Sequence, residues 1–209
     1  TPLRVLEIGC GTGQLACALA QRGHTGVGTD PAQAMLDIAQ ARGCGGNISW
    51  LQADAAGLDL PEPFDLIVMT GHVFQVFVTD DEIEAALASF RRHLAANGRL
   101  AFETRNPTAK AWQGWNQAQP SQQVQVPTIG PVTVFYDPQQ VAGEQVTFET
   151  NFIFADGERL ALPSTLRFLT QAGLEQRLRR AGFSRFEWFG NWDRTPITQS
   201  SLEIIVIAT

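Results

Sequence analysis

The sequence predicts an α/β domain built on a doubly wound, mostly parallel sheet of seven strands, with an inserted antiparallel β meander. Up to about residue 105, short apolar runs alternate with amphipathic helical stretches, which is typical of β-α-β units. Residues 121–168 instead alternate apolar and polar side chains in twos, which is typical of an antiparallel sheet. Residues 165–209 then return to the pattern of a helix followed by strands.

The first part of the chain should supply five strands and three helices. The helix before the fifth strand has the clearest boundaries, since Thr79 followed by Glu82 has the pattern of a capping box. Asn97-Gly98 is expected to end that helix. The expected strands are 3–8, 24–29, 47–52, 64–69 and 99–104, and the expected helices are 14–22, 32–42 and 80–96.

The rest of the chain divides into an insertion and a return to the main sheet. We expect a loop or short helix over 106–120, and then a meander with turns at Asp137-Pro138, Ala142-Gly143 and Asp156-Gly157. A helix capped by Thr170 and two further strands, 183–189 and 201–208, should close the fold. The expected divisions are 1–105 for the cofactor-binding half, 106–164 for an inserted β region that covers the substrate, and 165–209 for the end of the α/β domain.

Composition narrows the class of protein. The 209 residues are 44% hydrophobic and 17% charged, as in an ordinary globular domain. A net charge of -6 disfavours a nucleic-acid partner, and no apolar run approaches the length of a membrane helix. Three cysteines without C-x-x-C spacing indicate neither a disulfide framework nor a metal site. Since no signal peptide is visible either, we expect a cytoplasmic protein without a metal ion or a membrane partner.

A glycine-rich turn joins the first strand to the first helix. Gly9, Gly11 and Gly13 lack Cβ atoms where the chain turns most sharply, so that a flat ligand can approach the backbone. The dinucleotide motif G-x-G-x-x-G would require glycine where Gln14 stands, and no Gly-Lys-Ser/Thr of a phosphate loop follows. A tight turn with a purely structural role is the alternative interpretation of these glycines.

The motif Glu7-x-Gly9-x-Gly11-x-Gly13 resembles the first motif of the class I S-adenosylmethionine-dependent methyltransferases. The resemblance covers residues 3–105 well and 165–208 loosely. It implies a Rossmann-like methyltransferase fold with a last strand antiparallel to the others, S-adenosylmethionine as cofactor, and methyl transfer as the activity. It also implies a helical segment ahead of the first strand, whereas Thr1-Pro2 directly precede that strand here.

The resemblance places the cofactor beyond the carboxyl ends of the first four strands. Asp30 is expected to bind the ribose, and Asp54, with the Ala55 backbone, the adenine. A helix cap or a turn is the alternative role for each aspartate, and core packing is the alternative for Met35. The expected cofactor-binding residues are Glu7, Gly9, Cys10, Gly11, Gly13, Asp30, Pro31, Met35, Asp54, Ala55, Thr70 and Gly71.

Catalysis and acceptor binding are expected from residues after the fourth and fifth strands. His72 is the candidate base, required only for an acceptor that is protonated at neutral pH. Its alternative role is a loop histidine that shapes the pocket. The expected acceptor-binding residues, for which packing of the meander is the alternative role, are Arg105, Trp112, Trp115 and Tyr136.

The acceptor is expected to be a small molecule. Met69-Thr70-Gly71-His72 departs from the Asn/Asp-Pro-Pro-aromatic motif of nucleic-acid amino-methyltransferases, whereas Asp30-Pro31-x-x-x-Met35 resembles the small-molecule branch, quinone-ring methyltransferases included. Two other functions stay open. One is a non-catalytic binding or assembly module, with the meander pairing across a homodimer. The other, disfavoured by Gln14, is a nicotinamide-dependent oxidoreductase.

Overall fold

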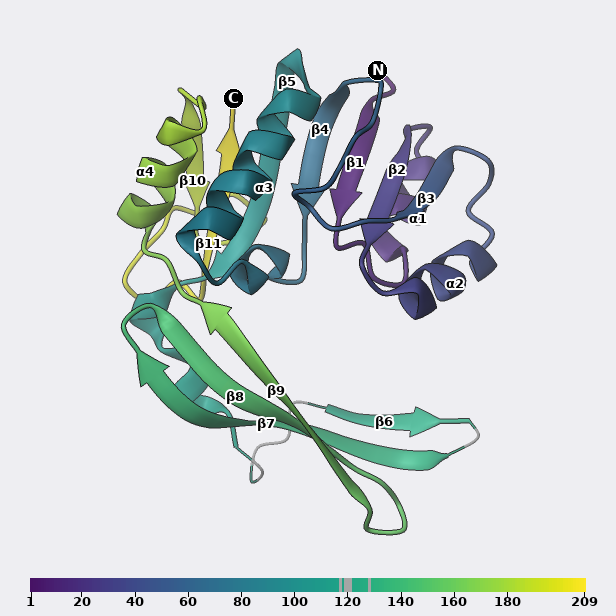
Figure 1. Cartoon of the computed structure of the whole chain (residues 1–209), viewed down its shortest axis with the longest axis vertical. Helices are drawn as coiled ribbons and strands as arrows, with labels where there is room; N and C mark the ends of the chain where they lie inside the picture. Colours follow the sequence, from purple (N-terminus) through teal and green to yellow (C-terminus); the bar gives the residue numbers. More distant parts are fainter. Residues whose placement is uncertain (117, 119–121, 128) are drawn as a thin grey trace.

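Two β-sheets organise the chain in the computed structural model, which describes residues 1–116, 118, 122–127 and 129–209 (Figure 1). The larger sheet has seven strands in the order β10-β11-β5-β4-β1-β2-β3, and the smaller has four in the order β6-β7-β8-β9. The expected α/β class with an inserted antiparallel sheet is therefore confirmed. Parts of the expected loop 106–120 and of the expected meander lie outside the described residues.

The first half of the chain builds the parallel part of the larger sheet. β1 lies at its centre, paired in parallel with β2 on one side and β4 on the other. The strand order changes direction between β1 and β4, so a crevice forms beyond their carboxyl ends. The elements are β1 (Arg4–Ile8), α1 (Gln14–Ala20), β2 (Thr25–Asp30), α2 (Gln33–Ala41), β3 (Ile48–Gln52), β4 (Phe64–Met69), η1 (Val73–Val76), α3 (Asp80–His93) and β5 (Leu94–Arg105).

The C-terminal part completes the sheet with a helix and two strands, α4 (Gln171–Arg180), β10 (Phe186–Phe189) and β11 (Glu203–Ala208). β11 runs antiparallel to both β5 and β10, as the resemblance implied. Thr170 caps α4 by accepting a hydrogen bond from the N–H of Gly173. This ending places Glu203 directly opposite Arg105 at the carboxyl end of β5.

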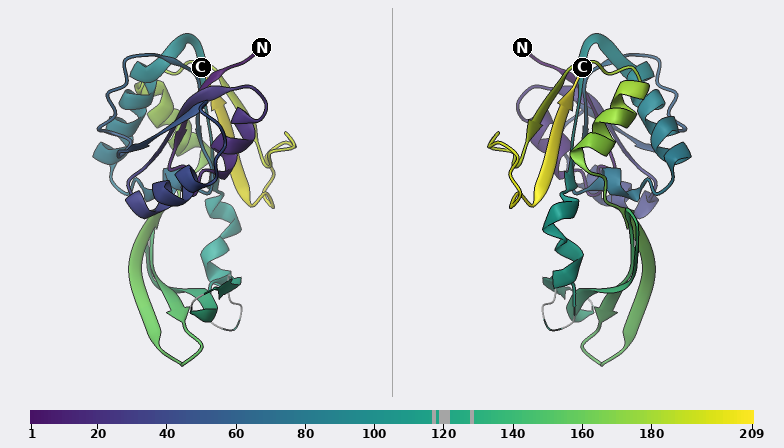
Figure 2. Two further views of the ribbon diagram at one scale, coloured as in Figure 1. Left: turned by 90° about the vertical axis from the view of Figure 1, so that its right-hand side faces the viewer. Right: turned by 90° about the vertical axis from the view of Figure 1, so that its left-hand side faces the viewer.

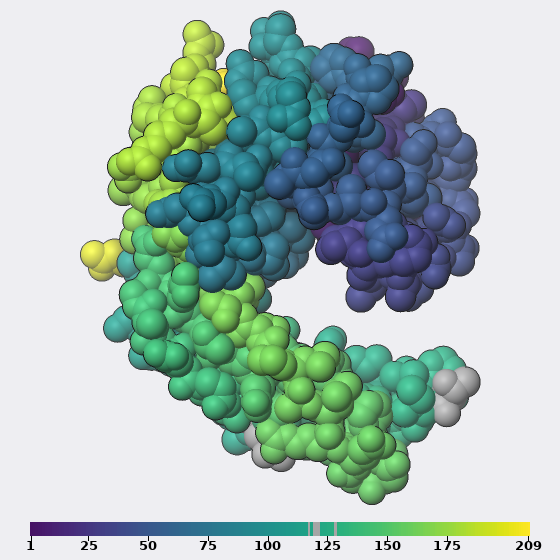
Figure 3. Space-filling model, viewed as in Figure 1, coloured from purple at the N-terminus to yellow at the C-terminus, as the bar shows by residue number. Residues whose placement is uncertain are grey.

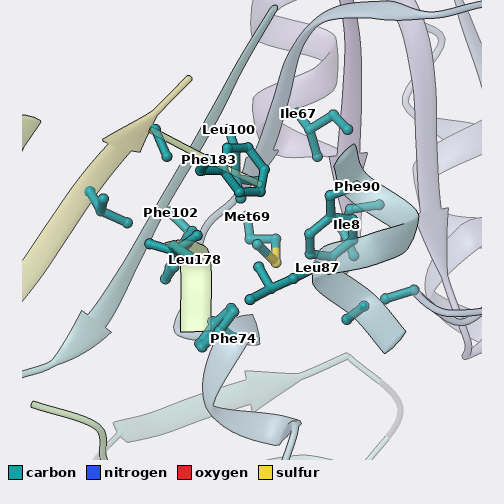
Figure 4. Packing of buried hydrophobic residues seen from close by; sticks show 14 of the residues in the cluster. Ile8, Ile67, Met69, Phe74, Leu87, Phe90, Leu100, Phe102, Leu178 and Phe183 are labelled. Carbon is teal, nitrogen blue, oxygen red and sulfur yellow. The ribbon is translucent and has the colours of Figure 1, made fainter. Parts of the chain in front are cut away.

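The hydrophobic core lies between the sheet and the helices α3 and α4. Leu87, Phe90 and Leu178 from these helices pack against strand residues of β4 and β5 (Figure 4). Phe102 of β5 is fully buried and stacks on Phe74 of η1, with ring centroids 4.3 Å apart. α1 covers the opposite face of the sheet (Figure 2). Helices therefore lie on both faces of the parallel part of the sheet, with α1 against β2 and β3.

The start of α3 is as expected, but its end is not. Thr79 accepts a hydrogen bond from the N–H of Glu82, and the Glu82 carboxylate accepts one from the N–H of Thr79, which confirms the capping box. The helix ends at His93 rather than at residue 96, and Asn97-Gly98 lies within β5. A Cβ at Gly98 would come within 2.7 Å of the carbonyl oxygen of Phe64, so this glycine permits a close approach between strands.

The insertion forms a curved antiparallel sheet below the larger one (Figure 1). The expected turn at Asp137-Pro138 is wrong, because both residues lie inside β7, where the pairing with β8 shifts between Pro138 and Gln140. Such an irregularity accommodates a proline in a strand. β9 extends three residues past the expected limit of 164. The elements are η2 (Pro107–Ala109), η3 (Ala111–Gly114), β6 (Gln122–Val126), β7 (Gly130–Ala142), β8 (Gln145–Ile153) and β9 (Arg159–Arg167).

A hollow separates the four-stranded sheet from the end of the α/β part that carries α2 (Figure 3). β1 and β4 both point toward this hollow (Figure 1). The carboxyl ends of the central strands therefore face the insertion. Within the part of the chain that the structure describes, we find no helix that is both long and apolar enough to cross a membrane.

A disulfide joins Cys17 of α1 to Cys44, which follows α2, with Cα atoms 4.9 Å apart. The cysteine spacing indicated no disulfide framework, and this bond was therefore not predicted. The two cysteines are 27 residues apart, and they meet because α1 and α2 both pack on β2 and β3. No local spacing motif signals such a pairing. Cys10 is the free cysteine, and it is buried.

Candidate active site

The glycine loop has the left-handed backbone that its sequence predicts. Gly9, Gly11 and Gly13 have φ angles of 65°, 52° and 74°. A Cβ at Gly9 would press against Val73, and one at Gly13 against Trp50, so these two glycines are required by packing as well as by backbone conformation. Nothing lies within 4 Å of the corresponding position at Gly11. The middle of the loop therefore borders open space.

A cavity of about 420 Å³ lies beside this loop at the carboxyl ends of β1 and β4. Four of the expected cofactor residues line it, namely Glu7, Gly9, Cys10 and Thr70. Thr12, Gln14 and Leu15, which were not predicted from the sequence, line it as well. The position of the cavity is the switch point of the strand order, where open α/β sheets bind ligands.

Backbone donors at the cavity come from the start of α1 rather than from the glycines themselves. The N–H of Gly11 is bonded to Asp30 and that of Gly13 to the carbonyl of Cys10. Among the described residues, nothing accepts a hydrogen bond from the N–H of Gln14 or Leu15, which precede the first helical hydrogen bond. These two N–H groups are therefore the donors that an anionic group in the cavity would meet.

Glu7 is buried at the end of β1, with 3% of its surface exposed. Its Oε2 accepts a hydrogen bond from the N–H of Ala16 at 2.9 Å. Burial raises the pKa of Glu7 to about 7, and the bond from Ala16 offsets only part of that increase. A cation in the cavity would stabilise the ionised carboxylate, so Glu7 is suited to an ammonium ligand.

Cys10 contributes a neutral wall to the same cavity. Burial, with a smaller contribution from the carboxylates of Glu7 and Asp30, raises the pKa of its thiol to about 12. A thiol with so high a pKa is neutral near pH 7 and is not an activated nucleophile.

Asp30 fixes the turn between β2 and α2. Its Oδ2 accepts a hydrogen bond from the N–H of Gly11 and its Oδ1 one from the N–H of Ala32, both at 2.9 Å. The side chain is buried, yet each carboxylate oxygen can accept a second hydrogen bond. Asp30 thus holds the glycine loop and still has acceptor capacity for a ligand.

Neither Asp30 nor the other residues expected around the adenosine line this cavity. Asp54 is exposed, and its Oδ1 accepts a hydrogen bond from the N–H of Gly57 at 2.6 Å, as in the alternative role of a turn residue. Met35 is 43% exposed, so the alternative of core packing is wrong for it. Ala55 is buried in the main core, and Pro31 and Gly71 are exposed.

His72 follows β4 in a left-handed conformation, with φ of 64°. Its Nε2 lies 3.0 Å from each carboxylate oxygen of Glu203. Since a carboxylate only accepts, Nε2 carries the proton, and Nδ1 is the acceptor in the neutral ring. The backbone N–H of His72 also donates to Oε1 of Glu103 at 3.0 Å. A histidine oriented in this way can serve as a base.

Arg105 and the expected aromatic residues meet at the junction of the two sheets. Arg105 donates to Oε1 of Gln75 at 2.9 Å, and its guanidinium lies 5.5 Å from the Trp115 ring centroid. Burial lowers the pKa of Arg105, while Glu203, Tyr136 and Glu103 raise it. Trp115 lies 5.1 Å from Tyr136 by ring centroids. The structure thus brings three of the four expected acceptor residues into direct contact.

Trp112 joins this group through an edge contact with Phe168, at 4.6 Å between ring centroids, and Trp115 lies 6.3 Å from the same ring. These contacts connect the insertion to the α/β part, which is the packing role considered as an alternative. Sequence reasoning missed Glu103 and Glu203. Two charged residues, Glu103 and Arg105, at alternate positions of a buried strand were the available signal.

The described residues contain no candidate metal-binding site. Nowhere in residues 1–116, 118, 122–127 and 129–209 are three His, Cys, Asp or Glu side chains arranged to hold a metal ion.

A second cavity, of about 680 Å³, lies near the start of α4 between Thr170, Asn106 and Gln199, and none of the expected site residues lines it.

Comparison with known proteins shows which sequences and folds this chain resembles. Residues 5–98 match the model of the family described as "Methyltransferase domain". A ubiquinone biosynthesis O-methyltransferase of Pseudomonas fluorescens is 35% identical over 116 residues. That alignment covers 52% of this chain and 47% of the relative, so the chain spans about half the length of the curated relatives it matches.

Solved structures resemble the whole chain, insertion included. The CcbJ methyltransferase of Streptomyces caelestis has a TM-score of 0.80 at 19% identity, covering 100% of this chain and 83% of that one. S-adenosylmethionine-bound CalS10, described as an amino pentose methyltransferase of Micromonospora echinaspora, has a TM-score of 0.72 at 21% identity, covering 100% and 84%.

The strand order, the antiparallel last strand and the glycine loop thus define the class I methyltransferase fold. Residues 5–98, a little under half of the chain, are similar in sequence to the methyltransferase domain family.

Proposed function

We propose that the protein is an enzyme that transfers the methyl group of S-adenosylmethionine to an oxygen, nitrogen or carbon nucleophile of a small molecule. The observation that carries this proposal is the cavity at the carboxyl ends of β1 and β4, beside the open space at Gly11. The proposal concerns the whole chain, whereas the family match covers residues 5–98. The region expected at 106–164 would cover the acceptor.

The residues around the cavity fit the methionyl end of this cofactor. Its ammonium group would meet the Glu7 carboxylate and the backbone at Gly9 and Thr70, and its carboxylate would meet the N–H groups of Gln14 and Leu15. Opposite charges thus find opposite partners within one cavity. Cys10 and Leu15 supply neutral walls between them.

The adenosine end has fewer enclosing groups. Asp30 would accept hydrogen bonds from the ribose hydroxyls, because both of its oxygens retain acceptor capacity. Met35 is exposed enough to cover one face of the adenine. Gly13, Pro31, Asp54, Ala55 and Gly71 remain assigned to the cofactor by the resemblance.

The bound cofactor supplies an activated methyl group on a sulfonium. The protein's main contribution is therefore to align the acceptor with that methyl group. His72 would remove a proton from an acceptor that carries one, with Nδ1 as the acceptor atom and Glu203 holding the ring. Arg105, Trp112, Trp115 and Tyr136 would form the walls of the acceptor site.

Isothermal titration with S-adenosylmethionine and, separately, with NAD tests this proposal and its alternatives. We expect binding of one S-adenosylmethionine per chain and none of NAD. Binding of neither ligand would favour the non-catalytic module, and binding of NAD alone would favour the oxidoreductase.

The proposal extends to partners. A chain of net charge -6 is unsuited to a nucleic-acid acceptor, and we expect no binding to a DNA or RNA duplex at 0.15 M salt.

Pairing of two copies through the four-stranded sheet is supported by exposed apolar side chains on it: Val124, Val141, Leu160 and Leu162. Light scattering of the purified chain should give twice the monomer mass, and a monomer at micromolar concentration would contradict the pairing.

A cytoplasmic location is part of the proposal. The Cys17–Cys44 disulfide opposes it, since disulfides persist mainly in oxidising compartments. Alkylation of thiols in intact cells, followed by mass spectrometry, decides the matter. Reduced Cys17 and Cys44 would support the cytoplasmic location, and a fully oxidised pair would contradict it.

A further inference from the structure

Glu103, near the end of β5, has a buried oxygen without a hydrogen-bond donor. The side chain is 5% exposed, and its Oε1 accepts a hydrogen bond from the backbone N–H of His72. Its Oε2 is buried and has no partner among the described residues. Leaving a buried acceptor unpaired is costly, so such a group requires a donor from outside the chain, such as water, an ion or a ligand.

The surroundings of Glu103 carry an excess of negative charge. β5 and β11 pair Arg105 opposite Glu203, and Glu103 lies two residues before Arg105, so all three side chains leave the same face of the sheet. We call Glu103, Arg105, Glu203 and His72 the acceptor cluster. With a neutral His72, this cluster has two carboxylates and one guanidinium. A monovalent cation would balance it.

Neither Arg105 nor His72 donates a side-chain hydrogen bond to Oε2 of Glu103. Arg105 donates to Gln75 and stacks over Trp115. The Nε2 atom of His72 is held by Glu203. A donor from outside the chain is therefore needed, and the rings of Trp115 and Tyr136 beside Arg105 would favour a cation over a neutral donor.

From this arrangement we infer that the acceptor is an amine, bound as its ammonium form by Oε2 of Glu103. The inference rests on the proposed methyl transfer and narrows its acceptor to nitrogen. Neither oxygen nor carbon nucleophiles would carry the positive charge that the acceptor cluster lacks.

The bound ammonium must lose a proton before it can react, because it has no free lone pair. Nδ1 of His72 takes that proton while Glu203 holds Nε2–H. The nitrogen lone pair then forms the new N–C bond as the bond between the methyl carbon and the sulfonium sulfur breaks. Positive charge passes from sulfur to nitrogen, and the proton on His72 is later released to solvent.

Matched ligand pairs test the inference on the full chain saturated with S-adenosylhomocysteine. The pairs are benzylamine with benzyl alcohol, cyclohexylamine with cyclohexanol, and glucosamine with glucose, each titrated calorimetrically at pH 7. In at least one pair the amine should bind ten or more times tighter than the alcohol. Equal binding within every pair, or no binding by any amine, would overturn the inference.

The variant Glu103→Gln keeps the shape of the side chain and its bond from His72 but removes the charge. We expect it to abolish the preference for the amine and to leave S-adenosylhomocysteine binding within twofold. Glu187→Gln, a change at an exposed position of β10, is the matched control and should retain the preference. A preference that survives Glu103→Gln would assign Glu103 a structural role.

The two proposals fail in distinguishable ways. If S-adenosylhomocysteine binds and the alcohols bind as well as the amines, the amine inference fails and the methyltransferase proposal stands. If S-adenosylhomocysteine does not bind, the methyltransferase proposal fails, and the amine inference fails with it.

Discussion

The two sheets of this protein bury their side chains in different ways. Strands of the seven-stranded sheet, such as β4 and β11, are buried along most of their length. In the four-stranded sheet β6 is largely exposed, and β9 is exposed over its first half. The comparison assigns rigidity to the part that would hold the cofactor and adaptability to the part that would cover the acceptor.

The sharpest test of this contrast is Phe102→Ala in the larger core. Phe102 is fully buried and stacked on Phe74, so its truncation should lower the free energy of unfolding by about 3–5 kcal/mol. Chemical denaturation measures the loss. Phe148→Ala, in β8, is the comparison variant: hydrogen exchange should show lost protection in β7 and β8 alone. Loss of protection in β4 and β5 for Phe148→Ala would show that the two sheets are one cooperative unit.

The next effect comes from Glu7 and depends on pH. Burial raises the pKa of Glu7 from 4.5 to about 7, so the folded chain retains a proton that the unfolded chain has lost. The stabilisation is complete below about pH 4.5 and disappears as the pH rises to about 7, a loss of about 3 kcal/mol. Glu7→Gln should lack this loss. Denaturation curves of both proteins at pH 5 and pH 8 measure it, and parallel pH profiles would contradict the raised pKa.

A smaller effect is expected for Asp30→Ala on cofactor binding. Loss of the carboxylate would leave ribose hydroxyls without acceptors and loosen the glycine loop, at a cost of about 1–3 kcal/mol in binding. Calorimetric titration with S-adenosylmethionine should show a dissociation constant raised roughly fivefold to 150-fold. Asp54→Ala provides the comparison at the other expected carboxylate. An unchanged constant in folded Asp30→Ala would remove Asp30 from the site.

The smallest effect on stability is expected at the exposed face of the four-stranded sheet. Leu162→Thr replaces a side chain that is 46% exposed and should change the free energy of unfolding by no more than about 0.5 kcal/mol. If two copies pair through this sheet, the same change should weaken the dimer, as measured by sedimentation. A large loss of stability in the monomer would show that this face is packed within the chain.

The sequence predicted the regular part of the fold well. β4 has the expected bounds, and Thr79 and Glu82 cap α3 as their spacing indicates. The errors occurred where tertiary contacts override a local signal. Asn97-Gly98 has the pattern of a helix stop, yet Gly98 lies in β5 against the Phe64 carbonyl. Asp137-Pro138 has the pattern of a turn, yet an irregular pairing keeps both residues in β7.

The site residues that belong to local sequence motifs were predicted, and those that lie outside such motifs were not. Glu7 and Gly9 belong to a local pattern, and the structure places them at one cavity. Glu103 and Glu203 belong to none, because they are 100 residues apart and reach the same face of the sheet only through the pairing of β5 with β11. The same reason hid the Cys17–Cys44 bond, which depends on how α1 and α2 pack.

A crystal structure of the chain with S-adenosylhomocysteine tests the central claim most directly. The account predicts the amino-acid end of the ligand in the cavity lined by Glu7, Gly9 and Thr70, with the ribose hydroxyls within hydrogen-bond distance of Asp30. A ligand bound elsewhere would contradict the account. So would a ligand whose ribose does not reach Asp30 and whose amino-acid end leaves the cavity filled by solvent.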